Sequence, residues 1–215
     1  MIYTMEVVPA SSVDIFNKPA RILVSGFSGC GKSVLVGKII KKYIDSFTEI
    51  IISGSENFPV EAHPKIIIHS GERAYDPFAQ NINDGKHRLL IYDDYMLDNE
   101  SGKTIAKVYI EGRHLSLSCI YIAQNILHNS PYHRAIALNC SYFILLRMRN
   151  IAQIKHFARS FLDKSKIESF VEVYRKYVEE KMHSHLLIDF TQLSNSRLMI
   201  RTDIVGPDLE KVVIL

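Results

Sequence analysis

The stretch GFSGCGKS, residues 26–33, decides the fold of this 215-residue chain because it fits the pattern G-x-x-x-x-G-K-[ST]. The short apolar run RILVS (21–25) comes directly before it and predicts a buried strand. The segment GKSVLVGKIIKKYI (31–44) has apolar residues at helical spacing and lysines on the other face, which predicts an amphipathic helix. This strand–loop–helix context favours a phosphate-binding loop over an ordinary glycine-rich turn.

Each residue type in this loop has a physical reason. Glycines let the backbone curl so that several N–H groups point at phosphate oxygens, and the following helix adds the positive end of its dipole. Lys32 is expected to reach the β- and γ-phosphates of ATP, and Ser33 to supply a hydroxyl to Mg²⁺. Cys30 is interpreted as a small filler that contributes mainly its backbone N–H. The predicted nucleotide-binding residues are Gly26, Phe27, Ser28, Gly29, Cys30, Gly31, Lys32 and Ser33.

A nucleotide loop of this kind needs an acidic element for the metal, and the run LLIYDD (89–94) provides one. Apolar residues 89–92 predict a buried strand that ends at Asp93. Asp93 is expected to hold Mg²⁺, through water or through Ser33, and Asp94 to polarise the water that attacks the γ-phosphate. The alternative is a surface turn with two solvated acids.

The third element is the run SCIYIAQN (118–125), a predicted strand that ends in polar residues. In hydrolysing P-loop proteins with an additional strand, this strand lies between the loop strand and the acidic strand. Gln124 is expected to contact both the γ-phosphate and the attacking water, since an amide both donates and accepts. The alternative is a polar residue that only ends the strand. The base-reading pattern of GTPases is absent, because NKPA (17–20) lacks its Asp and precedes the loop.

The remaining segments alternate between strand-like and helix-like patterns, which predicts an α/β fold: a P-loop NTPase with a mostly parallel central sheet flanked by helices. The C-terminal runs 185–190 and 197–204 predict a strand pair, and HSH (183–185) a turn. We expect one domain over residues 1–215, with its core at about 20–205. The other predicted strands are 49–53, 65–69 and 141–148, and the other predicted helices are 101–113, 151–162 and 164–182.

Composition narrows the class of protein. With 47% hydrophobic and 23% charged residues, the chain is ordinary for a globular protein, and its net charge of +3 is compatible with a nucleic-acid partner. Three cysteines without framework spacing predict a reducing compartment and no disulfides. No signal peptide and no membrane-spanning apolar stretch are expected, so the sequence predicts a soluble intracellular protein. The basic stretch 149–160 is a candidate DNA-facing or inter-subunit surface.

Four stretches in order resemble a known family: GFSGCGKS, LLIYDDYM (89–96), EGRHLSLSCIYIAQNILHNS (111–130) and RAIALNCSYFILLRMRN (134–150). Together they are similar to the viral genome-packaging ATPases of the FtsK–HerA superfamily. The closest branch is the poxvirus-like one, which is also found in virophages and Maverick/Polinton transposons. The resemblance runs from about residue 20 to about residue 205. It implies a RecA-like ATPase core, a homo-oligomeric ring, and translocation of double-stranded DNA into a preformed capsid, with capsid or portal proteins as further partners.

The resemblance also implies roles for individual residues. It implies that Lys32 binds phosphate and that Ser33 binds magnesium. It also implies that Asp93 and Asp94 are the family's acidic pair and that Gln124 is its sensor glutamine.

Arg113 corresponds to the family arginine that precedes the sensor strand, and in such rings an arginine from one subunit can complete the neighbouring subunit's site. Arg147 and Arg149 are rivals for that role, because they follow the next strand. For Arg113 the alternative is a solvated cation at the C-terminal end of a helix. The implied localisation is the host nucleus or viral factory, with possible association with the virion. Two other functions stay open, a nucleotide or small-molecule kinase and a slow nucleotide-dependent switch or scaffold.

Overall fold

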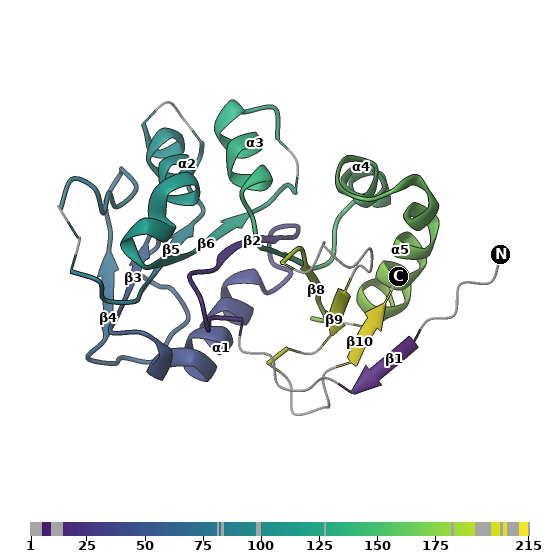
Figure 1. The fold of residues 1–215 in the computed structure, drawn as a ribbon, viewed down its shortest axis with the longest axis horizontal. Helices are drawn as coiled ribbons and strands as arrows, with labels where there is room; N and C mark the ends of the chain where they lie inside the picture. The colour runs from purple at the N-terminus through teal and green to yellow at the C-terminus, as the bar shows by residue number, and fades with distance from the viewer. Residues whose placement is uncertain are drawn as a thin grey trace.

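In a computed structural model, one mixed sheet runs through the whole molecule (Figure 1). The structure describes residues 6–9, 15–80, 82, 84–97, 100–126, 128–181, 183–191, 199–202, 204–205 and 211–214, with only the backbone given for 6–9 and 211–214. Within these residues the sheet has ten strands in the order β1-β10-β9-β8-β7-β2-β6-β5-β3-β4.

The central part of the sheet is parallel, and the end that contains the chain's last strands is antiparallel. β6 lies between β2 and β5, as predicted for the additional strand. The parallel strands are β2 (Arg21–Ser25), β3 (Glu49–Ser53), β4 (Ile66–His69), β5 (Arg88–Asp93), β6 (Leu117–Ala123) and β7 (Tyr142–Leu145). The antiparallel strands are β8 (Leu186–Asp189), β9 (Met199–Thr202), β10 (Lys211–Ile214) and β1 (Glu6–Pro9).

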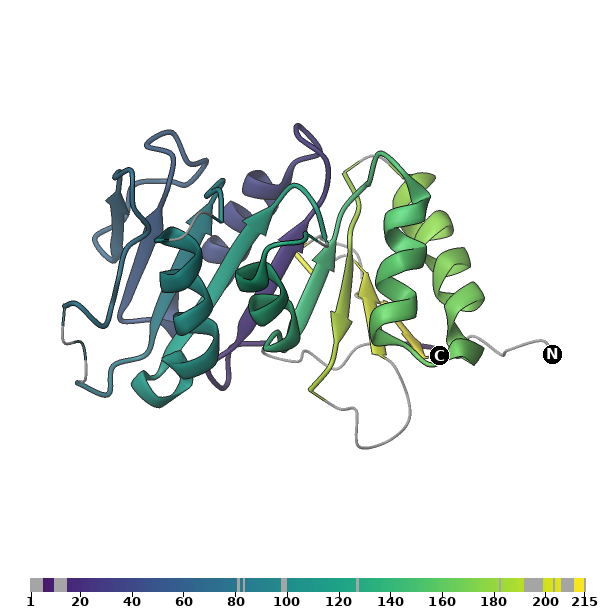
Figure 2. The ribbon, with the colours of Figure 1, turned by 90° about the horizontal axis from the view of Figure 1, so that it is seen from above.

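Helices cover both faces of the sheet, as Figures 1 and 2 show from two directions. α1 (Lys32–Tyr43) lies on one face. On the opposite face lie α2 (Ser101–Glu111), α3 (Pro131–Leu138) and α4 (Ile151–Phe161), with α5 (Ile167–Tyr174) packed beside α4. Short 3₁₀ turns occupy Ile44–Ser46, Gly112–Leu115 and Lys164–Lys166, and a π-helical turn occupies Arg175–Glu179.

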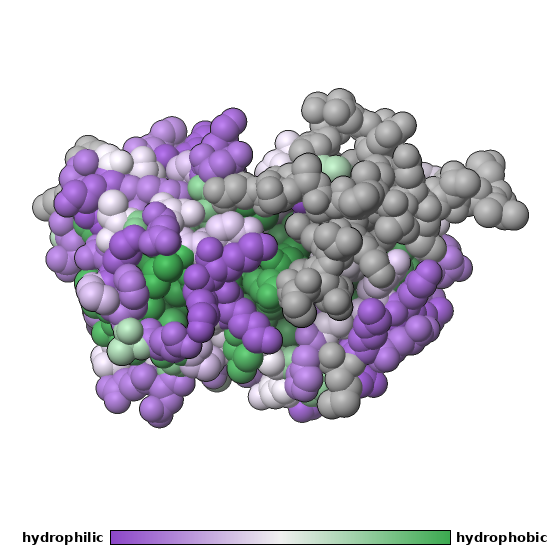
Figure 3. Space-filling model, turned by 90° about the horizontal axis from the view of Figure 1, so that it is seen from below, coloured by the Kyte–Doolittle hydropathy of each residue, from purple (hydrophilic) through white to green (hydrophobic). Residues whose placement is uncertain are grey.

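The two faces of the sheet carry separate hydrophobic cores. Leu23 and Tyr121 belong to the core under α2 to α5, whereas their neighbours Val24 and Ile122 belong to the core under α1. Because both faces are covered, the central strands are continuous apolar runs without alternation. On the side of α1 the surface shows apolar patches between polar side chains (Figure 3), and Val34 of α1 is 52% exposed.

The predicted α/β class, the mostly parallel sheet and the C-terminal strand pair 186–189 and 199–202 are confirmed. Three elements were not predicted, namely α3, β1 and β10. The predicted helix 164–182 was too long, because it is divided into a 3₁₀ turn, α5 and a π-helical turn. The predicted turn at 183–185 is present, with His183 at a φ of 58°. In the described part of the chain, no helix is both long and apolar enough to span a bilayer.

Candidate nucleotide-binding site

The candidate site lies at the carboxyl edge of the parallel strands, where an α/β sheet normally binds its ligand. The loop of residues 26–31 leaves β2 at this edge and enters α1 at Lys32. The flanking strands β6 and β7 and the acidic strand β5 end at the same edge. The topology therefore brings together the predicted loop, the acidic pair and Gln124.

The shape of the loop depends on its glycines in two different ways. Gly29 and Gly31 have φ angles of 82° and 94°, in the left-handed region that favours glycine. Gly26 has no positive φ, but a Cβ there would lie 2.6 Å from Cys30 Sγ and 2.9 Å from Leu146 Cβ. Gly29 and Gly31 therefore allow the curl, and Gly26 allows close packing against Cys30 and against Leu146, which follows β7.

Hydrogen bonds hold the loop on the sheet. Phe27 N donates to Arg147 O at 3.0 Å, and Gly26 N donates to Ala123 O at 3.4 Å. Lys32 Nζ donates to the carbonyls of Gly26 and Phe27, at 2.9 and 3.1 Å, so the ammonium group lies inside the loop.

Cys30 is buried, and burial raises the pKa of its thiol. Its side chain fills the space beside Gly26, as expected of a filler. Its N–H donates to Phe27 O at 3.2 Å, so in this structure that N–H supports the loop itself and is not aimed at a ligand.

Ser33 and Asp93 meet across the sheet edge, although they lie far apart in sequence. Ser33 Oγ lies 3.4 and 3.3 Å from the two carboxylate oxygens of Asp93. Burial raises the pKa of the Asp93 carboxyl, and Asp94 raises it further, while Ser33 and Lys32 counteract the rise. A hydroxyl beside a partly buried carboxylate gives the hard oxygen ligands that Mg²⁺ prefers, so these residues fit the predicted metal.

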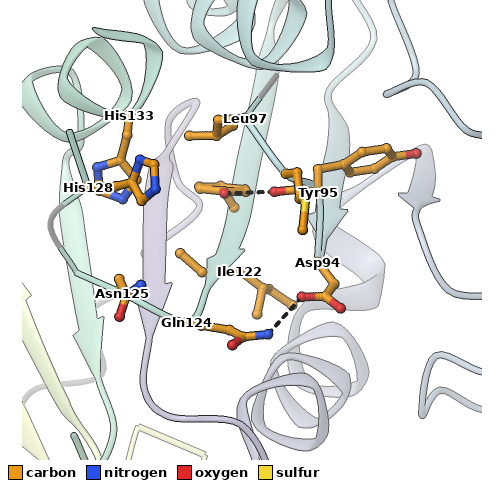
Figure 4. Close-up of a pocket in the computed structure, with 11 residues that line it drawn as sticks. Asp94, Tyr95, Leu97, Ile122, Gln124, Asn125, His128 and His133 are labelled. Carbon is orange, nitrogen blue, oxygen red and sulfur yellow. Dashed lines mark hydrogen bonds between the residues drawn. The ribbon is translucent and has the colours of Figure 1, made fainter. Parts of the chain in front are cut away.

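Asp94 and Gln124 also meet, where β5 and β6 end. Gln124 Nε2 donates to Asp94 Oδ1 at 3.2 Å, and both side chains are exposed (Figure 4). Asp94 has a φ of 58°, so the chain turns sharply out of the sheet at this residue.

Two tyrosines that sequence reasoning missed hold this turn. Tyr121 Oη donates to Tyr95 O at 3.1 Å, and Tyr95 Oη lies 2.9 Å from Ser53 Oγ. The signal for Tyr95 was its place directly after the acidic pair, but its partners come from distant strands that no local pattern could indicate.

Gln124 borders two cavities. The first, of about 290 Å³, contains Asp94 and Gln124 at one end and His128 and His133 at the other (Figure 4). The second, of about 270 Å³, is lined by the loop residues Phe27 and Ser28 together with Gln124, Arg149 and Gln153.

The three candidate arginines lie in different places. Arg113 is exposed in the 3₁₀ turn that precedes β6, at the amino-terminal edge of the sheet. The seven-residue strand β6 separates it from the carboxyl edge by about 20 Å, so Arg113 does not reach the site of its own chain. Arg147 contacts the loop through its main-chain oxygen, and its side chain is exposed. Arg149 lines the cavity beside Phe27 and Ser28 in the same chain.

Similarity to known proteins tests the family resemblance that the motifs predicted. No family model matches the chain. It is 24% identical over 220 residues to the DNA packaging protein OPG160 of Vaccinia virus (strain Copenhagen), covering 93% of this chain and 80% of that protein. The monkeypox virus protein of the same name is also 24% identical, with 93% of this chain and 72% of that protein covered. The chain is homologous to the poxvirus DNA packaging proteins. The resemblance predicted from its motifs is thereby confirmed.

Solved structures share the fold of this chain. The genome packaging NTPase B204 from Sulfolobus turreted icosahedral virus 2, in complex with sulfate, aligns with a TM-score of 0.57 at 14% identity, covering 86% of this chain and 96% of B204. VirB4 of Thermoanaerobacter pseudethanolicus aligns with a TM-score of 0.58 at 13% identity, covering 84% and 91%. At such identities the likeness shows the fold alone.

Proposed function

We propose that this chain is an ATP-hydrolysing motor that moves double-stranded DNA into a viral or virus-like capsid. The observation that carries the proposal is the meeting of four predicted elements at one sheet edge, namely the loop with Lys32, the Ser33–Asp93 pair, Asp94 and Gln124. Homology to poxvirus DNA packaging proteins along 93% of the chain supports the packaging role.

The loop would bind and orient the phosphates of ATP. Backbone N–H groups of the loop and the N-terminus of α1 would hold the phosphates of ATP. Lys32, now bonded to the loop carbonyls, would turn its ammonium group toward the β- and γ-phosphates. Ser33 and Asp93 would hold Mg²⁺, which when bound neutralises charge on the phosphate oxygens.

Asp94 and Gln124 supply the hydrolytic step. Asp94 accepts a proton from the attacking water, and Gln124 orients that water against the γ-phosphate. Because the Gln124 amide donates to Asp94 in the present arrangement, the same amide has to turn toward the phosphate for this role. A change of partner at Gln124 thus offers a way to couple nucleotide state to the loop that follows β6.

The ring is part of the proposal. Arg113 lies at the opposite edge from its own loop, so it completes a site only when a neighbouring subunit presents it there. Arg149 lies beside its own loop, and this position favours a role within the same chain. We place the assembly at a capsid or portal, in the viral factory, host nucleus or virion.

The experiment that tests the proposed function measures phosphate release with ATP·Mg²⁺, alone and with duplex DNA. A DNA motor should release phosphate faster when duplex is added, and Lys32→Ala should abolish release. If the chain is a kinase, duplex DNA should not change phosphate release, and phosphate transfer should require an acceptor substrate. If it is a slow switch, duplex DNA should not accelerate phosphate release. Either of these results would contradict the proposal.

A further inference from the structure

The chain has an acid-free segment that begins just before β6. Residues 112–162 contain no Asp or Glu, although the whole chain has 23 acids among 215 residues. The same segment contains six Lys or Arg residues: Arg113, Arg134, Arg147, Arg149, Lys155 and Arg159. A segment of this length with only one sign of charge indicates an anionic partner.

Five of these six cations lie on two helices, α3 and α4, or on the loop that leads into α4, and Arg134 also lines a groove between the helices. α3 and α4 lie on the same face of the sheet, and both begin at the carboxyl edge (Figures 1 and 2). Between them lies a cavity of about 680 Å³, which we call the α3–α4 groove. Its lining includes His128, Ser130, His133, Arg134, His156 and Ser160.

The exposed arginines of α3, of α4 and of the loop before α4 are not neutralised by the chain. Arg134, Arg147, Arg149 and Arg159 are exposed, and in the described part of the chain none of them forms an ion pair with a carboxylate. The arrangement contrasts with Arg88, which makes a bidentate pair with Asp84 at 2.6 and 2.8 Å. Clustered cations of one sign repel each other and are relieved by a bound polyanion.

Helix geometry adds to the positive potential at the same edge. Ser130 caps α3 by accepting from Tyr132 N at 3.2 Å, and Asn150 caps α4 by accepting from Ala152 N at 2.8 Å. Each cap satisfies one N–H, and the remaining first-turn N–H groups carry the positive end of the helix dipole. Phosphate oxygens are favoured at such helix starts, beside Arg134 and Arg149.

The α3–α4 groove is also joined to the catalytic pair. His128 and His133 line both the groove and the cavity that contains Asp94 and Gln124. Gln153 of α4 donates from Nε2 to Asn125 Oδ1 at 3.4 Å, next to Gln124 in the chain. A ligand bound in the groove would therefore contact His128 and His133, which follow the sensor strand.

From these observations we infer that the α3–α4 groove, with Arg134 and Arg159 on its two helices, binds the phosphate backbone of duplex DNA independently of base sequence. The inference deepens the proposed function and rests on it. Duplex DNA fits because its phosphates present one negative charge per roughly 1.7 Å of axis, which the exposed, unpaired arginines of α3, of α4 and of the loop before α4 complement.

The test compares two double variants in binding to a labelled duplex of about 30 base pairs, in two unrelated sequences and over a series of salt concentrations. Arg134→Ala/Arg159→Ala removes the arginine that lines the groove and an exposed arginine of α4, and Lys38→Ala/Arg175→Ala removes two exposed cations, one on α1 and one directly after α5. Neither pair belongs to the nucleotide site. The groove variant should bind both duplexes about tenfold more weakly, with its salt slope reduced by about 2, while the control binds like wild type.

Basal ATP hydrolysis and thermal stability should stay at wild-type values in both variants. Poly-glutamate of matched charge should displace the duplex poorly. Equal DNA binding by the groove and control variants would overturn the inference while leaving the proposed function intact. Efficient displacement by poly-glutamate would overturn it as well, because the groove would then bind acidic protein equally well. If wild-type protein binds no duplex at all, the proposed function fails together with the inference.

Discussion

Gln124 Nε2 donates a hydrogen bond to Asp94 Oδ1 at 3.2 Å, which ties the end of the sensor strand to the second acid of the acidic strand. The two residues are 30 positions apart in sequence and lie side by side because β6 is inserted between β2 and β5. The Gln124 amide occupies one of the two carboxylate oxygens of Asp94. We propose that this contact is the point at which the state of the nucleotide, or of DNA, controls hydrolysis.

Gln124→Ala tests this contact. The variant should bind ATP with wild-type affinity, because the hydrogen bonds that hold the loop and join Ser33 to Asp93 do not involve Gln124. It should lose the acceleration by duplex DNA, because the link between the loop after β6 and Asp94 is gone. Phosphate release with and without duplex measures the effect. Full DNA stimulation in the variant would show that Gln124 is not the coupling residue.

The two acids should separate in function. Asp94→Asn should keep ATP·Mg²⁺ bound and lower turnover by about 10²–10⁴, because a general base contributes that much. Asp93→Asn should instead weaken nucleotide binding only when Mg²⁺ is present, because Asp93 lies beside the Ser33 hydroxyl. Nucleotide titrations with Mg²⁺ and with EDTA separate the two effects. Normal turnover in Asp94→Asn would remove Asp94 from the role of base.

Asp93 should also lower the stability of the protein when no metal is bound. Burial raises the pKa of its carboxyl above the ordinary value of 3.8, so ionisation is harder in the folded state than in the unfolded state. The contribution of Asp93 to stability is present at low pH and is lost as pH rises through the raised pKa. Asp93→Asn should therefore have a higher Tm than wild type at pH 7 in EDTA, and the difference should shrink toward pH 4. An equal or lower Tm at pH 7 would contradict this account.

Arg113 should act on the nucleotide site of a neighbouring subunit, and Arg149 on the site of its own chain. Arg113→Ala should bind ATP but turn over about 10³–10⁵ more slowly, because an arginine supplied in trans contributes that much. Mixing it with excess Asp94→Asn should restore part of the activity, because a site that combines the intact acids of one variant with Arg113 of the other is whole.

Arg149→Ala is the matched control for this mixing experiment. Arg149 lines the cavity beside its own loop, so mixing Arg149→Ala with Asp94→Asn creates no whole site and should restore nothing. Restoration with Arg149→Ala but not with Arg113→Ala, in rings shown to contain both variants, would assign the trans role to Arg149.

Local patterns predicted most of the sheet, since each central strand is an apolar run bounded by polar residues. They also predicted the meeting of Ser33 with Asp93, because parallel strands present their carboxyl ends at one edge. α3 was not predicted, as its eight residues are too few for a clear helical period, although Ser130 and Pro131 are good start signals. The contacts of Tyr95 with Ser53 and of Tyr121 with Tyr95 depend on strand order, which no local pattern contains.

If hydrolysis moves the protein along duplex DNA, displacement of a labelled third strand from a DNA triplex measures this movement directly. With ATP·Mg²⁺, wild-type protein loaded on a duplex extension should displace the third strand, and Asp94→Asn should bind the same substrate without displacing it. If wild-type protein hydrolyses ATP on this DNA and the third strand stays bound, the chain is not a translocating motor.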